Sequence, residues 1–412
     1  MNKATNVAQT IVQNTDTHKL FVRDSFTWLG YLLMASAVYT ISCFGPMMPF
    51  LRAELNLSYT IGAFHFSAWA VGVLIAGMIG DRAMKKFGRQ NTIWAACAGI
   101  CSGILMVIFM RNPAFTIFGA LLGGLSASTI GQTINTIMSD RFGSERALGI
   151  TEANIIASIS CFLAPLAVSL SIRLGLGWRF AIAFPLLSIS VLFLLFRKRR
   201  VPGAEPAQRI ETAAPLPLAY WAYWTVITLN VGCEWSMIFW SADFLEKVGK
   251  LPRIDASACV SVFLAAMLIG RIAGSRLARS FDIHTLLPIA AITSMVGFSI
   301  YWLGPTAPVN VTGLFITGLG IANFYPLTLS AAITVASDRA AIATSRLSLG
   351  TGAAILLAPL VLGFIADHTS IFAAYGLIAV LITTCTGMVF VANSLAHRHD
   401  RRERLLAADA SV

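Results

Sequence analysis

Twelve apolar stretches follow one another along the chain, and polar segments separate them. Each stretch has about 20 residues or more, which is the length an α-helix needs to cross the ~30 Å hydrocarbon core of a bilayer. A helix in lipid can carry apolar side chains on every face, whereas a helix at a water interface needs a polar face. The pattern predicts an all-α integral membrane protein with twelve transmembrane helices. The predicted spans are residues 28–51, 58–79, 91–110, 114–138, 147–172, 178–196, 218–242, 256–275, 285–304, 309–334, 343–366 and 371–395.

The chain also repeats itself at an offset of 194 residues, which separates Gly80 from Gly274 and Gly124 from Gly318. Each copy of the repeat contains six of the apolar stretches. Two parallel six-helix repeats are the plan of one large class of secondary transporters, so we predict two pseudo-symmetric six-helix bundles. The predicted parts are a cytoplasmic tail (1–26), an N-terminal bundle (27–196), a cytoplasmic linker (197–217), a C-terminal bundle (218–396) and a second cytoplasmic tail (397–412).

Composition agrees with a lipid environment. The chain is 57% hydrophobic and 12% charged, with a mean hydropathy of +0.74, whereas soluble domains carry about 25% charged residues. Of the 30 Lys and Arg, 21 fall on the side of the N-terminus and 7 on the opposite side. The positive-inside rule then predicts a protein of the plasma (inner) membrane with both termini on the cytoplasmic side. This distribution argues against a nucleic-acid groove, and the short loops leave no room for a soluble catalytic domain.

We therefore expect that the protein is not an enzyme and that it binds no cofactor and no metal. The seven cysteines all lie within apolar stretches, and their spacing matches no metal-binding pattern. The expected partners are a small-molecule substrate, protons and membrane lipids, and we expect a monomer.

The loop between the second and third stretches carries the clearest motif. Gly80-Asp81-Arg82 is followed by Gly88-Arg89, which resembles the signature loop of the major facilitator superfamily (MFS), with four extra residues before the Gly-Arg pair. The resemblance implies the MFS fold and a secondary active transporter that works by alternating access, with helices one, four, seven and ten around a central cavity. Further matches are Gly177-Trp178-Arg179, Gly270-Arg271 with Gly274-Ser275-Arg276, and Gly318-Leu319-Gly320 with Phe324-Tyr325-Pro326.

Polar side chains recur at helical spacing on helices one, four, seven and ten. Such a stripe is typical of a wet cavity, although polar residues also form hydrogen bonds between helices. In the seventh span, for example, Asn230 and Glu234 are one turn apart. The predicted cavity residues are Glu234, Asn230, Gln132, Asn135, Tyr39, Thr40, Asn323, Tyr325 and Trp235.

Glu234 stands out because it is an acid deep within a predicted span. A charge at that depth costs at least ~2.5–3.5 kcal/mol on insertion scales, so such a group is usually kept for a function. We predict that Glu234 carries a proton or binds substrate, and a structural salt bridge with an arginine is the alternative. Glu152 and His65 are the other candidates for a proton-carrying group, although a lone membrane histidine such as His65 is more often a hydrogen-bonded packing residue.

Other charged residues near the span ends are predicted to act in gating. By resemblance, Asp81 holds Arg141 or the start of helix eleven at the cytoplasmic side. Family geometry sets helices five and eight face to face, so we hypothesise that Glu152 and Arg271 form a cytoplasmic gate in the outward-open state. The predicted gating residues are Asp81, Arg82, Arg89, Arg141, Glu152, Arg271, Arg346 and Asp243.

The leading hypothesis for function is a proton-coupled transporter of a small organic solute, either a symporter or an antiporter. A drug or metabolite exporter and a lipid flippase on the same fold are the alternatives. Of the glycine-rich motif typical of drug antiporters, only Ala164-Pro165 remains in the fifth span.

Overall fold

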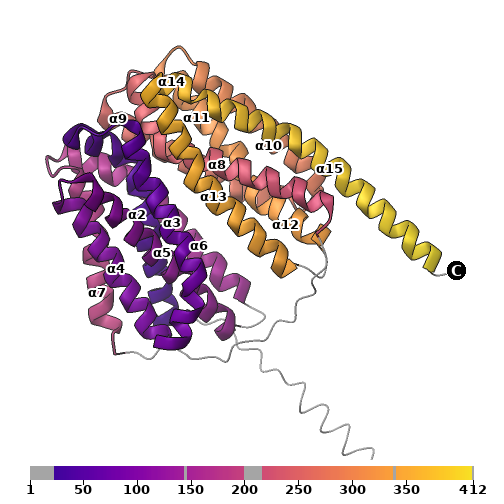
Figure 1. Cartoon of the computed structure of the whole chain (residues 1–412), viewed down its shortest axis with the longest axis horizontal. Helices are drawn as coiled ribbons and strands as arrows, with labels where there is room; N and C mark the ends of the chain where they lie inside the picture. The colour runs from indigo at the N-terminus through magenta and orange to yellow at the C-terminus, as the bar shows by residue number, and fades with distance from the viewer. Residues whose placement is uncertain (1–22, 143–145, 199–215, 337–339, 411–412) are drawn as a thin grey trace, which may run out of the picture.

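The structure is a computed structural model, and it describes residues 23–142, 146–198, 216–336 and 340–410. All regular secondary structure in these ranges is helical, and the helices form two bundles (Figure 1). The N-terminal bundle contains α2 (Ser25–Leu55), α3 (Tyr59–Phe87), α4 (Arg89–Phe109), α5 (Pro113–Phe142), α6 (Arg146–Arg173) and α7 (Trp178–Phe196). The C-terminal bundle contains α8 (Leu218–Lys247), α9 (Arg253–Leu277), α10 (Ile283–Leu303), α11 (Ala307–Ile321), α12 (Phe324–Ala336), α13 (Ala340–His368), α14 (Ile371–Ala374) and α15 (Gly376–Ala410).

The predicted fold class is confirmed. Within the described residues, 11 helical segments are long and apolar enough to span a membrane, and α11 with α12 counts as one of them. The remaining segment, α8, has 30 residues and packs against α2, α9, α13 and α15. Tryptophans, tyrosines and polar residues along α8 keep its hydropathy below that of the spanning segments, and most of its residues are buried, as expected of a helix that faces protein rather than lipid.

Local sequence explains how several of these helices begin and break. The side chain of Asp24 caps α2 by accepting a hydrogen bond from the Thr27 N–H, and Ser58 caps α3 in the same way. The tenth span is interrupted between α11 and α12. Pro326 follows this interruption, and a proline has no N–H to donate to the carbonyl of Ala322 and crowds it.

Two predicted boundaries differ from the structure. Helix α2 starts at Ser25, inside the predicted tail, and α15 continues as a helix to Ala410, through most of the predicted second tail. Most of the predicted linker (199–215) and of the first tail (1–22) lies outside the described residues.

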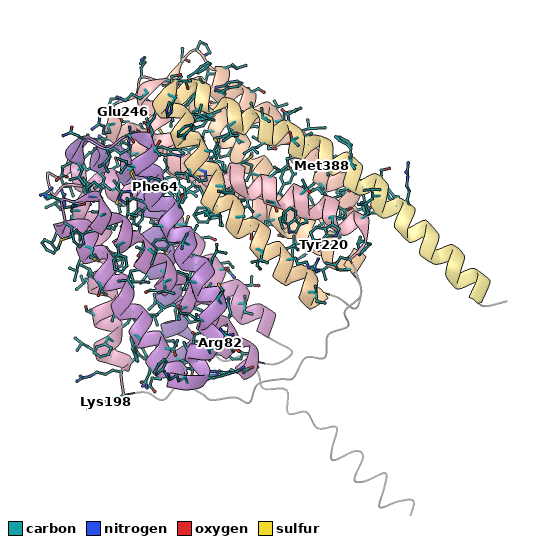
Figure 2. The ribbon with its side chains drawn as sticks, viewed as in Figure 1. Phe64, Arg82, Lys198, Tyr220, Glu246 and Met388 are labelled. Atoms are coloured by element: carbon teal, nitrogen blue, oxygen red, sulfur yellow. The ribbon has the colours of Figure 1, made fainter. Side chains whose placement is uncertain are left out.

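The two bundles meet at one end and diverge at the other (Figure 1). We call the end that holds Arg82 and Lys198 the linker end, and the end that holds Glu246 the far end (Figure 2). One buried apolar cluster runs across both bundles and includes Phe244 and Tyr375 from the far end of the C-terminal bundle. A second cluster, around Tyr220 and Val389, contains residues of the C-terminal bundle only. The apolar core is therefore continuous between the bundles at the far end and divided at the linker end.

Candidate functional site

A cavity of about 240 Å³ lies between the two bundles. Helices α2 and α6 form its wall on the N-terminal side, and α8 and α9 form its wall on the C-terminal side. The N-terminal wall contributes the polar residues Ser42, Asn154 and Ser158, and the C-terminal wall contributes Glu234 and Arg271. The rest of the lining is mostly apolar, so among the described residues the charged side chains of the cavity are both on the C-terminal wall.

Glu234 and Arg271 face each other in this cavity. Glu234 Oε1 lies 3.7 Å from Arg271 Nη2, and the two side chains are 13% and 45% exposed, respectively. The carboxyl group therefore lies deep in the cavity and the guanidinium group lies nearer its mouth. The separation is within reach of Coulomb attraction but longer than a hydrogen bond. The predicted alternative of an arginine partner for Glu234 thus has a geometric basis, although the pair is not a tight one.

The polar stripe on α6 was not singled out from the sequence. Asn154, Ser158 and Cys161 follow one another at i, i+4 and i+7 and all line the cavity. The same spacing rule that selected residues on the other helices would have found them. On α2 the cavity lies beside Val38, Ile41 and Ser42, a different face from the one that we predicted.

Several predicted cavity residues lie within one bundle instead. The Tyr39 hydroxyl donates to the carbonyl of Ala181 in α7, 3.1 Å away, and Thr40 donates to the Ser36 carbonyl of its own helix. Asn323 sits at the α11–α12 break and donates to the Gly270 carbonyl of α9 at 2.9 Å. The contacts of Tyr39 and Asn323 hold helices of the same bundle together.

The other predicted cavity residues on α5, α8 and α12 differ in their surroundings. Gln132 donates to Ser128, and the Oδ1 atom of Asn135 is buried without a hydrogen-bond partner among the described residues. Asn230 is buried, and its Nδ2 atom is in the same situation. Trp235 lines the cavity beside Glu234, and Tyr325 lies close enough to Glu234 to interact with it electrostatically.

At the far end, contacts made by charged side chains join the two bundles. Arg52 of α2 lies 2.6 Å from Asp243 of α8, and this pair is almost completely buried. Asp367 of α13 accepts hydrogen bonds of 2.7 Å from the backbone N–H groups of Tyr59 and Thr60, at the start of α3. A carboxylate is stabilised at a helix N-terminus by the free N–H groups and the helix dipole.

Further contacts close the far end beside α9. Ser257 donates to the Pro46 carbonyl of α2 at 2.9 Å, and Arg173 of α6 pairs with Asp255. The rings of Phe66 and Phe239 stack across the two bundles, with centroids 3.8 Å apart. The cavity is therefore sealed from the far end by ion pairs, helix caps and ring packing.

A model of the Major Facilitator Superfamily matches residues 28–342. The chain belongs to the major facilitator superfamily. This MFS transporter is similar to an uncharacterized MFS-type transporter of Yersinia pestis, with 24% identity over 92% of this chain and 97% of the relative. It is also similar to the protein TsgA of Shigella flexneri, with 22% identity over 91% of this chain and 97% of the relative.

Solved structures share the fold of this MFS chain. A peptide transporter POT in complex with sulfate covers 95% of this chain and 98% of its own, with a TM-score of 0.75 and 14% identity. A D-xylose-proton symporter covers 89% of this chain and 96% of its own, with a TM-score of 0.68 and 12% identity. The overall arrangement of helices is thus that of known MFS transporters.

At the linker end of the MFS fold, the predicted gating residues pair within one bundle. Glu152 accepts hydrogen bonds from Arg23, the shortest at 2.6 Å, and from the Tyr31 hydroxyl. Arg141 binds Asp24 at 2.7 Å. Partial burial disfavours the ionised form of Asp24, but the hydrogen bonds from Arg141 and Thr27 outweigh this effect and lower the pKa of the Asp24 carboxyl.

The signature-loop residues also pair locally. Asp81 lies 2.7 Å from Lys85, one turn further along α3, and it is exposed rather than bound to Arg141. Arg89 reaches Asp140 of α5 at 2.5 Å, so the displaced Gly-Arg of the motif ties α4 to the end of α5. Arg82 is exposed.

Two further predicted residues lie apart from the cavity. Arg346 stacks over the Trp221 ring at 5.4 Å near the linker end of the C-terminal bundle. His65 is buried, with Nε2 2.8 Å from the Thr116 hydroxyl and Nδ1 3.1 Å from the Ile61 carbonyl. His65 thus makes the contacts of a packing residue.

Proposed function

We propose that this chain is a secondary active transporter that moves a small organic solute across the plasma (inner) membrane by alternating access, coupled to protons. The observation that carries the proposal is the facing pair of Glu234 and Arg271 in a cavity between the two bundles. A carboxyl group at this depth can exchange a proton with the solvent only where the cavity reaches it, which makes it a suitable coupling group.

The arrangement of the bundles supports alternating access. Contacts between the bundles gather at the far end, and the core is divided at the linker end. The excess of Lys and Arg on the N-terminal side assigns the linker end to the cytoplasm in our proposal. The structure then corresponds to a state closed to the outside, and transport requires the far-end contacts to break while the linker end closes.

Purified protein in liposomes that contain a pH-sensitive dye tests this proposal. Sugars, amino acids, carboxylic acids and cationic drugs are added outside, one at a time, and the internal pH is followed. A symporter acidifies the lumen when its solute enters, whereas an antiporter makes the lumen more alkaline. Proton movement that depends on one solute and saturates with its concentration supports the proposal. Passive ion flux without solute, or no proton movement with any solute, contradicts it.

A further inference from the structure

The guanidinium group of Arg271 has unused hydrogen-bonding capacity. It carries five N–H donors in a planar fork, and it stays charged at any physiological pH. In the described part of the chain its ion-pair partner is Glu234 at 3.7 Å, too far for a hydrogen bond. The group is 45% exposed at the cavity mouth, so a planar anion can approach its donors from the open side.

The charge balance of the cavity favours an anion over a cation. In the part of the chain that the structure describes, the cavity lining holds one acid and one base, Glu234 and Arg271. A cation bound to Glu234 would leave Arg271 without a counter-charge, and arginine cannot lose its proton to compensate. An anion bound to Arg271 leaves Glu234 without its partner, and a carboxylate can take up a proton to compensate. Only the second exchange ends with no unpaired charge in the membrane.

The lining and the volume of the cavity indicate the size and polarity of this anion. Ile41, Leu264 and Met267 make much of the lining apolar, and the polar groups opposite Arg271 are the uncharged side chains of Asn154 and Ser158. A cavity of about 240 Å³ is below the ~300–1,000 Å³ of typical drug-sized pockets. The fitting ligand is a small molecule with one carboxylate and an apolar body.

We propose that the cavity binds a small organic carboxylate through Arg271, and that Glu234 takes up one proton when the carboxylate displaces it from Arg271. This inference rests on the proposed transport function and names its substrate class. The empty cavity, with Glu234 ionised and paired, has no net charge. The loaded cavity, with the carboxylate on Arg271 and Glu234 protonated, has no net charge either. The state with carboxylate but without the proton carries one unpaired negative charge, which lipid makes costly, so carboxylate and proton move together.

The pH dependence of binding follows from this competition. At high pH the ionised Glu234 competes with the carboxylate for Arg271, so carboxylate binding weakens as pH rises. Among the described residues, the other titratable groups near Glu234 are Cys161 of α6, which lines the cavity, and Tyr325 of α12. A protonated thiol and a phenol carry no charge between pH 5.5 and 7.5, so they add no charge to the exchange.

Thermal stabilisation of the purified protein by matched probes tests the inference. Butyrate, butyramide and butylamine share one body and differ in charge, as do benzoate, benzamide and benzylamine. We expect the carboxylates to stabilise the protein, more at pH 5.5 than at pH 7.5, and the amides and amines to have no effect. Arg271→Gln should weaken carboxylate binding by at least about tenfold, or about 1.4 kcal/mol, because glutamine has neither the positive charge nor the planar fork of donors that binds a carboxylate at two points. Glu234→Gln places a neutral amide where the competing carboxylate stands, so it should remove the pH dependence and raise carboxylate affinity at pH 7.5 toward the value of the unchanged protein at pH 5.5.

The two proposals fail in different ways. Stabilisation by an amine or an amide that survives Arg271→Gln overturns the carboxylate inference, while solute-dependent proton movement in liposomes would still support transport. Failure of every probe to bind, together with no solute-driven proton movement, contradicts both. If Arg271→Gln does not fold, Arg271→Lys replaces it, because a lysine keeps the charge but loses the planar fork and should bind carboxylates more weakly.

Discussion

At the depth of the cavity, the C-terminal bundle carries Glu234 and Arg271, and the N-terminal bundle carries Thr40 and Gly77 at the equivalent positions of the 194-residue repeat. Thr40 is buried and bonded to its own helix, and no described residue outside the adjoining turns of α3 lies within 4 Å of where a Cβ of Gly77 would be. The two bundles thus share one backbone arrangement but differ in the side chains that they place at the cavity. One bundle carries the charges and the other offers an uncharged wall.

The repeat is closely kept where helices pack. A Cβ at Gly124 would run into the carbonyl oxygen of Trp69, and a Cβ at the equivalent Gly318 would lie 2.7 Å from the carbonyl oxygen of Phe263. Trp69 and Phe263 are themselves equivalent positions. Close packing of α3 on α5 and of α9 on α11 therefore uses the same device twice. Agreement between the bundles marks packing, and disagreement marks the charges to which we assign function.

The largest predicted effect separates Glu234 from its equivalent, Thr40. Two pH units supply about 2.7 kcal/mol per proton, which permits about hundredfold accumulation of a co-transported solute. Glu234→Gln should abolish this accumulation in liposomes, because an amide cannot carry the proton, while exchange of solute without a gradient continues. Thr40→Val removes a hydroxyl at the equivalent position and should leave accumulation nearly unchanged. Equal losses in the two variants would contradict the division between the bundles.

The second prediction compares two ion pairs that join the bundles at the far end. Arg52–Asp243 is buried, whereas both side chains of Arg173–Asp255 are more than one-third exposed. Removing one partner of a buried ion pair lowers stability by about 3–5 kcal/mol, because the other charge stays buried and unpaired. An exposed ion pair contributes only about 0–1 kcal/mol to stability. Arg52→Gln should therefore open the far end much more than Arg173→Gln does.

The rate at which a thiol reagent alkylates a Ser257→Cys variant measures this opening. Ser257 is buried, and its hydroxyl donates to the Pro46 carbonyl across the bundles. In the Arg52→Gln background we expect alkylation at this cysteine to be faster by about a hundredfold or more, since each 1.4 kcal/mol is about a factor of ten. In the Arg173→Gln background we expect less than about a tenfold change. Similar rates in both backgrounds would show that the buried pair does not hold the far end closed.

The third prediction concerns the hypothesised gate between Glu152 and Arg271. In this structure Glu152 binds Arg23 and Arg271 faces Glu234, as expected if the two meet only when the far end opens. A Glu152→Cys/Arg271→Cys protein should cross-link several-fold more efficiently when Arg52→Gln is added. Glu152→Cys with Arg346→Cys is the control, because Arg346 is the repeat equivalent of Glu152 and stacks on Trp221. The gate hypothesis is contradicted if Arg52→Gln does not increase cross-linking of the first pair, or increases cross-linking of the control pair equally.

The fold could be predicted from the sequence because lipid imposes long apolar helices and because the repeat fixes their grouping. Glu234 could be found for a related reason, since a charge in a membrane span is costly and therefore conspicuous. Its partner Arg271 could not, because that contact depends on how α8 and α9 are rotated against each other. The sequence also did not tell which polar stripes face the cavity. A hydroxyl in a helix can donate to the carbonyl one turn back, as Thr40 does in the bundle interior and Ser42 does at the cavity.

The smallest predicted effect tests the packing that the bundles share. Gly124→Ala and Gly318→Ala each place a methyl group against a carbonyl oxygen of the neighbouring helix, and such overpacking typically costs about 1–3 kcal/mol. Both should lower the thermal unfolding temperature of the purified protein by similar amounts. At Gly131, also on α5, no described residue of another helix lies within 4 Å of an added Cβ. Gly131→Ala should therefore raise that temperature slightly, because alanine is up to about 1 kcal/mol better than glycine in a helix. If Gly124→Ala were harmful and Gly318→Ala harmless, the two bundles would differ in packing as well as in charge, and the repeat would no longer separate structural positions from functional ones.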